Sequence, residues 1–563
     1  MNQPLEKKRD KKLAELYKQE SEDLAVVLAK RHGLPYLDLS KTAINTDALR
    51  LIPMMEARAA GMAAFKVIGR TIHLATIAPA NPKIAEIIKD FENKNYQTEL
   101  YLVSENSLAL AWSLYAEISE SEASDVGLIQ ISAEQITAYL NRFQALSNIQ
   151  SALTEENRSA EQGSGISTIL EMILSGALAS EASDIHIEPE EKAVRLRYRL
   201  DGVLADVSEI STRIYRQIIS RIKLVSGMKL NIKLTAQDGR FSIKVSGEEI
   251  EIRASVIPSA YGESIVMRVL NPKSIQLSFE NLGVEDRLFK IFEKEIVKPN
   301  GLILLTGPTG SGKTTTLYAF LRRINLTGSK IITIEDPIEY HLKGINQTQV
   351  NREKKYTFLS GLRSALRQDP DIIMVGEIRD GETAKIAINS SLTGHLVFST
   401  IHTNNAAGTI PRLIDLGGNP KIISSALTIA IAQRLVRKLC PACKKSVEPT
   451  AEEKALLTEV TESIKLKRQD IVAPVIGQIF EAVGCLACNG SGYKGREGIF
   501  EAILMDEAVA KITTENPDEK EIRRAAIPQG ILDMRQDGIL KVLNGRTSLE
   551  ELRRVIDLTA EII

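Results

Sequence analysis

The residues with the clearest chemistry form a glycine-rich loop between an apolar run and a helical pattern. Residues 307–314 read GPTGSGKT and match G-x-x-x-x-G-K-[ST] at every fixed position. The apolar run 302–305 precedes the loop, and Leu317, Phe320 and Leu321 follow at helical spacing. In that context, backbone N–H groups turn onto phosphate oxygens, and the helix N-terminus adds its positive dipole end. The pattern therefore predicts a nucleoside triphosphate site, against the alternative of a glycine-rich surface turn.

The parts of this loop have distinct expected roles. Lys313 would reach the β- and γ-phosphates, and the Thr314 hydroxyl would ligate Mg²⁺. A nucleoside triphosphate and Mg²⁺ are therefore the expected ligands. The residues predicted to bind the nucleotide are Gly307, Pro308, Thr309, Gly310, Ser311, Gly312, Lys313, Thr314 and Thr315.

Three further segments look like buried parallel strands that end in polar residues. They are the runs 331–334, 372–375 and 396–401. A doubly wound sheet places its ligands at such carboxyl ends, and phosphoryl transfer needs groups that hold Mg²⁺ and orient water. A solvated loop carboxylate is the alternative for each residue alone. The residues expected around the γ-phosphate are Glu335, Asp336, Glu339, Glu377 and His402.

Arginines could supply the cation that phosphoryl transfer needs for its developing charge. Arg363 and Arg367 lie one helical turn apart before Glu377, while Arg253 and Arg268 lie in the preceding domain. A surface position is the default for any one of them. The alternative is an arginine finger, in which an arginine of one subunit reaches the nucleotide of its neighbour.

The four cysteines of the chain form two C-x-x-C pairs, Cys440 with Cys443 and Cys485 with Cys488. Each pair offers two thiolates to one metal, which suits tetrahedral Zn²⁺. Two disulfides or a redox motif are the alternatives, and a reducing compartment disfavours the disulfides. Four thiolates leave no open coordination position, so the predicted zinc is structural.

Composition and charge restrict the classes of protein. The 563 residues suggest three or four domains, and 71 basic against 72 acidic residues give a net charge of −1. This balance argues against bulk electrostatic binding of nucleic acid. The sequence lacks an apolar stretch long enough for a transmembrane helix, and its basic N-terminus is not followed by the apolar region of a secretory signal.

The chain is expected to be a multidomain α/β protein, with boundaries placed where the pattern changes. The expected parts are a charged tail (1–23), a first α/β domain with a helical extension (24–150), a flexible linker (151–165), a second α/β domain (166–278), a nucleotide domain (279–435), a tetracysteine region (436–500) and a helical tail (501–563).

Together these segments resemble the secretion ATPase superfamily, in particular the assembly ATPases of type IV pili and type II secretion systems. The match rests on four boxes in order, 307–314, 334–339, 369–380 and 393–403, which resemble Walker A, the Asp box, Walker B and the His box. Upstream, 182–189 and 237–240 resemble signatures of the second N-terminal domain. The resemblance implies a RecA-like P-loop ATPase core, preceded by two smaller α/β domains and followed by a zinc-knuckle region and a helical tail.

The resemblance also implies roles for single residues. Glu339 would activate the attacking water, Glu377 would be the Walker B glutamate beside Mg²⁺, and His402 would contact the γ-phosphate. Arg253 and Arg268 would approach the nucleotide on domain closure or from a neighbouring protomer. Further candidates are Glu335, Asp336, Arg240, Arg363 and Arg367.

Family members form cytoplasmic homohexamers that dock on an inner-membrane platform protein, so the same state and a peripheral membrane location are expected. The cysteine pairs and the extra N-terminal domain are typical of assembly rather than retraction ATPases. Many relatives carry cyclic di-GMP-binding repeats with an Arg-Leu-Gly start. That tripeptide is absent from the sequence, so cyclic di-GMP is not an expected ligand.

The leading functional interpretation is a motor for type IV pilus extension, and a type II secretion ATPase is its nearest rival. A nucleic-acid translocase would need a basic, aromatic-lined channel, which near-zero charge and 5% aromatic residues disfavour. A nucleotide-binding scaffold without hydrolysis would be expected to lack a catalytic carboxylate, yet Glu339 and Glu377 are both present.

Overall fold

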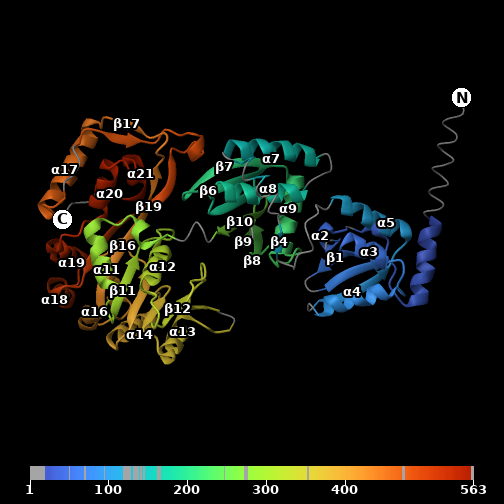
Figure 1. Cartoon of the computed structure of the whole chain (residues 1–563), viewed down its shortest axis with the longest axis horizontal. Helices are drawn as coiled ribbons and strands as arrows, with labels where there is room; N and C mark the ends of the chain where they lie inside the picture. Colours follow the sequence, from blue (N-terminus) through green and yellow to red (C-terminus); the bar gives the residue numbers. More distant parts are fainter. Residues whose placement is uncertain are drawn as a thin grey trace. The chain divides into compact units, whose positions relative to one another are not determined.

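The computed structural model divides into two compact units, Met1–Leu270 and Asn271–Ile563, and each unit is described by itself (Figure 1). Among the described residues, none of the helices combines the length and apolar character that a membrane crossing requires. The structure describes residues 19–559 apart from 43, 50, 69–70, 94–95, 118–127, 131–137, 140–141, 144–145, 162–165, 246–247, 272–276, 352–353 and 472–475.

The first unit begins with a small α/β domain around a three-stranded sheet of order β1-β2-β3. A helix over residues 19–32 precedes it. Glu22 of this helix accepts a hydrogen bond from the Ser104 hydroxyl at 2.6 Å, so residues 19–23 belong to the fold rather than to the predicted tail. The elements are α2 (Thr46–Leu49), α3 (Met54–Ala60), β1 (Met62–Ile68), β2 (Thr71–Thr76), α4 (Pro82–Asn93), β3 (Gln97–Leu102) and α5 (Glu105–Ser113).

The second domain of this unit is a seven-stranded sheet of order β4-β8-β9-β10-β5-β6-β7. Apolar residues of its helices and of the inward sheet face form one core. The elements are β4 (Leu128–Gln130), α7 (Leu146–Glu161), α8 (Ile166–Ala179), β5 (Asp184–Pro189), β6 (Val194–Leu200), β7 (Val203–Ile210), α9 (Thr212–Val225), β8 (Gln237–Val245), β9 (Glu248–Ser259) and β10 (Gly262–Leu270).

The predicted linker at 151–165 is wrong for residues 151–161, which continue helix α7. Ile149, Ala152 and Leu153 of this helix are buried in the domain core. This apolar stripe stabilises the helix despite its polar composition. The remainder of the predicted linker, 162–165, lies outside the described residues.

The second unit is built on a seven-stranded sheet of order β13-β12-β14-β15-β11-β16-β19, in which only β19 is antiparallel to its neighbour. Buried apolar runs form the central strands, as the sequence predicts. The expected RecA-like α/β core is therefore confirmed. Its strands are β11 (Gly301–Thr306), β12 (Ile331–Glu335), β13 (Asn346–Gln349), β14 (Ile372–Val375), β15 (Leu396–Ile401), β16 (Leu427–Leu439) and β19 (Tyr493–Leu504).

Helices cover both faces of this sheet, because alternate residues of each buried strand point to opposite sides. One face carries Ile303 and Leu305 and packs on α11 and α12, whereas Leu302 and Leu304 pack with α13, α14 and α16. The helices are α11 (Asp286–Glu295), α12 (Lys313–Ile324), α13 (Phe358–Ala365), α14 (Gly381–Leu392), α15 (Thr409–Asp415) and α16 (Pro420–Ala426).

The tetracysteine region lies between the two last strands of the core sheet. Strands β16 and β19 pair from Ile429 with Leu504 to Leu439 with Tyr493, so the predicted boundaries after residues 435 and 500 both fall inside strands. The sequence pattern missed this pairing because it joins segments far apart in the chain. The other elements are β17 (Lys445–Val447), α17 (Ala451–Lys467), β18 (Ile479–Glu481), α18 (Glu507–Glu515), α19 (Glu519–Ala526), α20 (Met534–Leu543) and α21 (Leu549–Val555).

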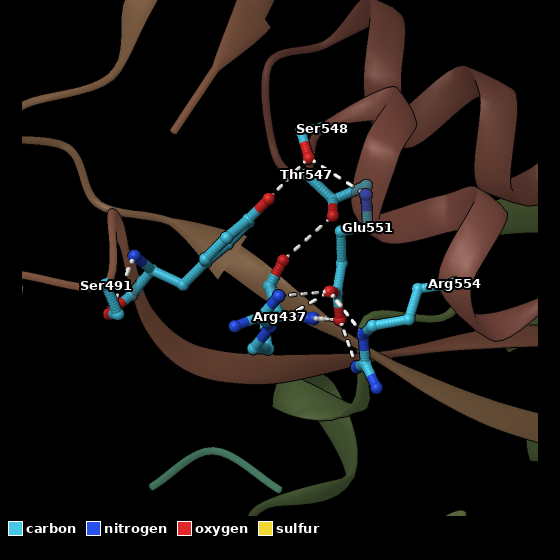
Figure 2. A network of polar contacts seen from close by, with 7 residues as sticks. Arg437, Ser491, Thr547, Ser548, Glu551 and Arg554 are labelled. Carbon is cyan, nitrogen blue, oxygen red and sulfur yellow. Dashed lines mark hydrogen bonds and ion pairs between the residues drawn. The ribbon is translucent and has the colours of Figure 1, made fainter. Parts of the chain in front are cut away.

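A buried carboxylate attaches the last helix to the core sheet. Figure 2 shows Glu551 of α21 between Arg437 of β16 and Arg554. Its oxygens accept hydrogen bonds from the Arg437 backbone at 3.0 Å and from the two guanidinium groups at 2.6–2.9 Å. Burial opposes the charge of Glu551, but these donors lower its pKa below the ordinary value. The Arg437 guanidinium also lies 4.0 Å from the ring centroid of Tyr493 on β19.

Candidate functional site

The phosphate loop connects β11 to α12 at the carboxyl edge of the core sheet, as the sequence predicts. Gly307 has φ +141°, and a Cβ there would lie 2.5 Å from the Gln433 carbonyl oxygen. Gly312 has φ +92°, and a Cβ there would lie 2.7 Å from the Gln433 side-chain nitrogen. Both positions therefore require glycine. The buried Ser311 hydroxyl has no hydrogen-bond partner among the described residues, so this cradle retains an unused polar group.

Lys313 begins helix α12 and folds back over the loop. Its ammonium group donates to the carbonyl oxygens of Gly307 at 2.7 Å and Pro308 at 3.0 Å. Burial lowers the pKa of Lys313, and the charge of Glu377 partly opposes this shift. Burial has partly removed the solvent that stabilises this cation, so a bound anion would stabilise it instead. A triphosphate at the N-terminus of α12 fits this requirement. Thr314 and Thr315 follow it in the first turn of α12.

Glu377 lies two residues beyond the end of β14, and the neighbouring strands fix its backbone. Gly376 donates to the carbonyl of Ile334, and the Thr400 hydroxyl donates to the carbonyl of Gly376 at 2.8 Å. The Glu377 carboxylate contacts Arg379 at 2.5 Å and Nε2 of His402 at 3.5 Å, and only 12% of its side chain is exposed.

His402 lies just after β15, on a turn fixed by Thr306 at the end of β11. The Thr306 hydroxyl donates to the carbonyl of Ile401 at 2.9 Å and accepts from the backbone of Thr403 at 2.8 Å. The imidazole is half exposed beside Glu377. The structure therefore brings the predicted Glu377 and His402 into contact at the carboxyl edge of the sheet.

The Asp-box residues separate into two environments. Asp336 is exposed at the turn after β12. The hydrogen bond from Arg379 to Glu377 raises the pKa of Arg379, and the charge of Asp336 adds to this shift. Glu335 is buried, and its carboxylate accepts hydrogen bonds from Thr333 and Tyr318. The expectation that Glu335 contacts the γ-phosphate is therefore wrong for this structure, because a residue that ends a buried strand can point into the packed face.

The arginines divide between the two units. In the second unit, Arg363 is exposed on α13, and Arg367 donates to the Arg363 carbonyl at 3.0 Å and to Ser364, so it folds back on its own segment. The structure thus gives neither of these arginines a contact with the predicted carboxylates.

Three predicted arginines of the first unit form a cross-strand row. Arg240 of β8 pairs with Arg253 of β9, which pairs with Arg268 of β10. Arg268 contacts Asp184 at 2.9 Å. Directly opposed residues in antiparallel strands share a sheet face, and like charges there are unfavourable. Arg253 also contacts a carboxylate, that of Glu251 at 2.9 Å, so two of the three arginines are paired with carboxylates of the same domain.

The four cysteine sulfurs lie within 4.8 Å of one another, although their pairs are far apart in the chain. Sulfur–sulfur distances are 3.9 Å for Cys440–Cys485, 3.7 Å for Cys443–Cys488 and 3.7 Å for Cys485–Cys488. Tetrahedral Zn–S bonds of about 2.3 Å imply sulfur separations of about 3.8 Å, so the donor set fits Zn²⁺. All four are free thiols in the structure, which excludes the two-disulfide alternative there.

Sequence reasoning missed two residues of β16 beside the phosphate loop. Gln433 is buried and accepts from the Thr316 hydroxyl at 2.8 Å, so it joins β16 to α12. Arg434 donates to the carbonyl of Asn404 at 3.3 Å. Its positive charge adds to the lowering of the Lys313 pKa that burial causes. Both follow the mainly apolar run 427–432, just as Glu377 follows the apolar run 372–375. The same pattern, polar residues directly after a buried strand, could therefore have predicted them.

This fold, with a phosphate loop beside a strand-end carboxylate and histidine, defines a RecA-like P-loop ATPase. The chain belongs to the Type II/IV secretion system protein family, whose profile matches residues 159–554. It is therefore an ATP hydrolase.

Similar proteins come from secretion and pilus systems. "Type II secretion system protein E" of Pseudomonas aeruginosa is 45% identical over 402 residues, covering 71% of this chain and 78% of the relative. "Type IV pilus assembly ATPase PilB" of Myxococcus xanthus is 35% identical over 535 residues, covering 95% and 91%. The X-ray structure of the Yersinia pseudotuberculosis ATPase DotB shares the fold, with TM-score 0.51 and 19% identity over 69% of this chain and 93% of that chain.

A second family profile, the MshEN domain, matches residues 32–122. This match weakens the expectation that cyclic di-GMP is not a ligand. That expectation rested on the absence of one tripeptide, whereas the profile matches most of the first domain. The exclusion of cyclic di-GMP is therefore withdrawn.

Proposed function

We propose that this chain is a homohexameric ATPase motor that drives type IV pilus extension through an inner-membrane platform protein. The observation that supports the pilus assignment is the share of this chain that aligns with each relative. The PilB relative aligns over 95% of this chain, whereas the type II secretion relative from Pseudomonas aeruginosa aligns over 71% despite its higher identity. A peripheral location on the cytoplasmic face of the inner membrane follows from this role. The second candidate, supported by that higher identity, is a type II secretion ATPase.

The chemistry proposed for the site assigns one task to each group. Lys313 and the loop amides would hold the β- and γ-phosphates, and Thr314 and Glu377 would hold Mg²⁺. A bound Mg²⁺ would neutralise charge on the phosphate oxygens. Glu339 orients the attacking water, and His402 contacts the γ-phosphate beside Glu377. These groups supply the positioning and charge stabilisation on which phosphoryl transfer depends.

The arginine row Arg240, Arg253 and Arg268 is proposed to contact nucleotide phosphates on domain closure or from a neighbouring protomer. Its support is the cross-strand alignment of the three arginines on one sheet face, where they lie close enough to contact one anionic ligand together.

Deletion of the gene tests the pilus assignment directly. We expect the deletion strain to lose surface pili and to keep its secreted enzymes, because assembly motors act on one filament system. Electron microscopy of pili and assay of culture supernatants measure both, and expression of the intact chain in the deletion strain is the control. Normal piliation together with a secretion defect would instead assign the chain to type II secretion.

The tetracysteine site is proposed to hold one structural Zn²⁺. Replacing Cys485 by serine removes one thiolate, so the metal content per chain should fall and the thermal midpoint should drop by several degrees. Elemental analysis and thermal unfolding measure these effects. The matched control is Ser446→Ala, an exposed position of the same region. Unchanged metal content in the Cys485→Ser variant would refute the zinc site.

A further inference from the structure

The hydroxyl of Tyr318 connects helix α12 to the segment after β12, and Tyr318 belongs to none of the four sequence boxes described above. Tyr318 lies on α12, five residues after Lys313, and its side chain is fully buried. The hydroxyl donates to the Glu335 carboxylate at the end of β12. It also accepts a hydrogen bond from the backbone N–H of Glu339 at 3.4 Å. One side chain of the phosphate-loop helix therefore contacts the segment that carries Glu339.

Glu335 makes this junction rigid. It is 3% exposed, and burial raises its pKa, while hydrogen bonds from Thr333, Tyr318 and Gln347 oppose that shift. The Gln347 side-chain N–H donates to the other carboxylate oxygen at 3.1 Å. A buried carboxylate that accepts several directed hydrogen bonds fixes the orientation of each donor, because losing any of them leaves polar groups unsatisfied.

The segment after Glu339 is held from the same side. Gln347 of β13 accepts from the backbone N–H of Leu342 at 2.6 Å and donates to the carbonyl of Tyr340 at 3.1 Å. The Tyr340 ring packs edge-on against Tyr318, with ring centroids 4.7 Å apart. The backbone around Glu339 is thus fixed on both sides, by Tyr318 at its own N–H and by Gln347 just beyond it.

We propose that Tyr318 is a positioning residue that fixes Glu339 relative to the phosphate loop. This inference rests on the proposed function, in which Glu339 orients the attacking water. Lys313 and Tyr318 belong to the same helix, α12. Phosphates held by Lys313 and the Glu339 backbone held by Tyr318 would therefore keep a constant separation. A core tyrosine with only a packing role would not need its hydroxyl to accept from the Glu339 amide.

Substitution of Tyr318 by phenylalanine tests this directly, because it removes the hydroxyl and retains the ring. We expect kcat for ATP hydrolysis to fall roughly 10- to 100-fold, as small misplacements of a catalytic group do, with KM for ATP nearly unchanged. In a Glu339→Gln background, the same substitution should cause little further loss, since the positioned group is already inactive. The matched control is Tyr356→Phe, whose hydroxyl donates to Thr348 at 2.9 Å and should leave kcat unchanged.

The outcomes separate this inference from the function on which it rests. A large effect of Glu339→Gln with unchanged kcat in Tyr318→Phe would overturn the role of Tyr318 and leave the proposed function intact. Equal fold-losses from Tyr318→Phe in the wild-type and Glu339→Gln backgrounds, or a loss of ATP affinity, would assign Tyr318 a general structural role and also overturn it. Full activity of Glu339→Gln would refute the role of Glu339 itself, and with it the inference.

Discussion

Replacement of Lys313 by alanine is expected to abolish ATP turnover and to weaken ATP binding. Its ammonium group is the cation of the phosphate loop and lies within hydrogen-bonding distance of the Gly307 and Pro308 carbonyls. A charge-assisted hydrogen bond contributes about 1.5–3 kcal/mol, so ATP affinity should fall roughly 10- to 100-fold. The loss of charge stabilisation in the transition state should reduce kcat by a further two to three orders of magnitude or so.

Binding of a fluorescent ATP analogue and phosphate release measure the two effects of Lys313→Ala separately. The matched control is Lys421→Ala, which removes an exposed lysine at the start of α16. Retained turnover in Lys313→Ala, with the control also active, would show that the phosphates do not bind against this loop.

Replacement of Glu377 by glutamine should spare ATP binding and reduce hydrolysis by roughly 100- to 1,000-fold. Glutamine keeps the size of the side chain but removes the negative charge that Arg379 and His402 contact in the structure. Nucleotide affinity depends mainly on the loop and Lys313, so the Kd for ATP should change little. The chemical step depends on the carboxylate, because a neutral amide lacks the negative charge that would stabilise Mg²⁺ and polarise the attacking water.

Single-turnover hydrolysis and equilibrium binding with Glu377→Gln distinguish these effects. Glu382→Gln is the matched control, since Glu382 is an exposed residue in the first turn of α14. A variant at Glu377 that hydrolyses ATP at the normal rate would remove this residue from the catalytic machinery.

Local sequence patterns were sufficient to predict the strand, loop and helix around residues 307–314, because each part of that unit is specified by neighbouring residues. The same holds for the strand ends before Glu377 and His402. The orientation of Glu335 could not be predicted, since it depends on Tyr318 and on which sheet face the last strand residue points to.

Long-range pairing was the other limit on prediction. Strand β19 joins β16 across the whole tetracysteine region, so the sequence boundaries after 435 and 500 divided one sheet. The stretch 151–161 resembled a linker because its sequence is rich in polar and charged residues, whereas Ile149, Ala152 and Leu153 of α7 are buried in the domain core. In both cases, the missing information was which distant surface a segment packs against.

The most direct test of the ring-motor account is ATP hydrolysis by the purified full chain, measured across a size-exclusion profile with Glu377→Gln as the control. The account predicts magnesium-dependent activity that is confined to a hexamer-sized peak and is lost in the variant. Full activity in a monomer peak would contradict a role for arginines from a neighbouring protomer. Intact ATP binding without hydrolysis in any peak would contradict the motor itself.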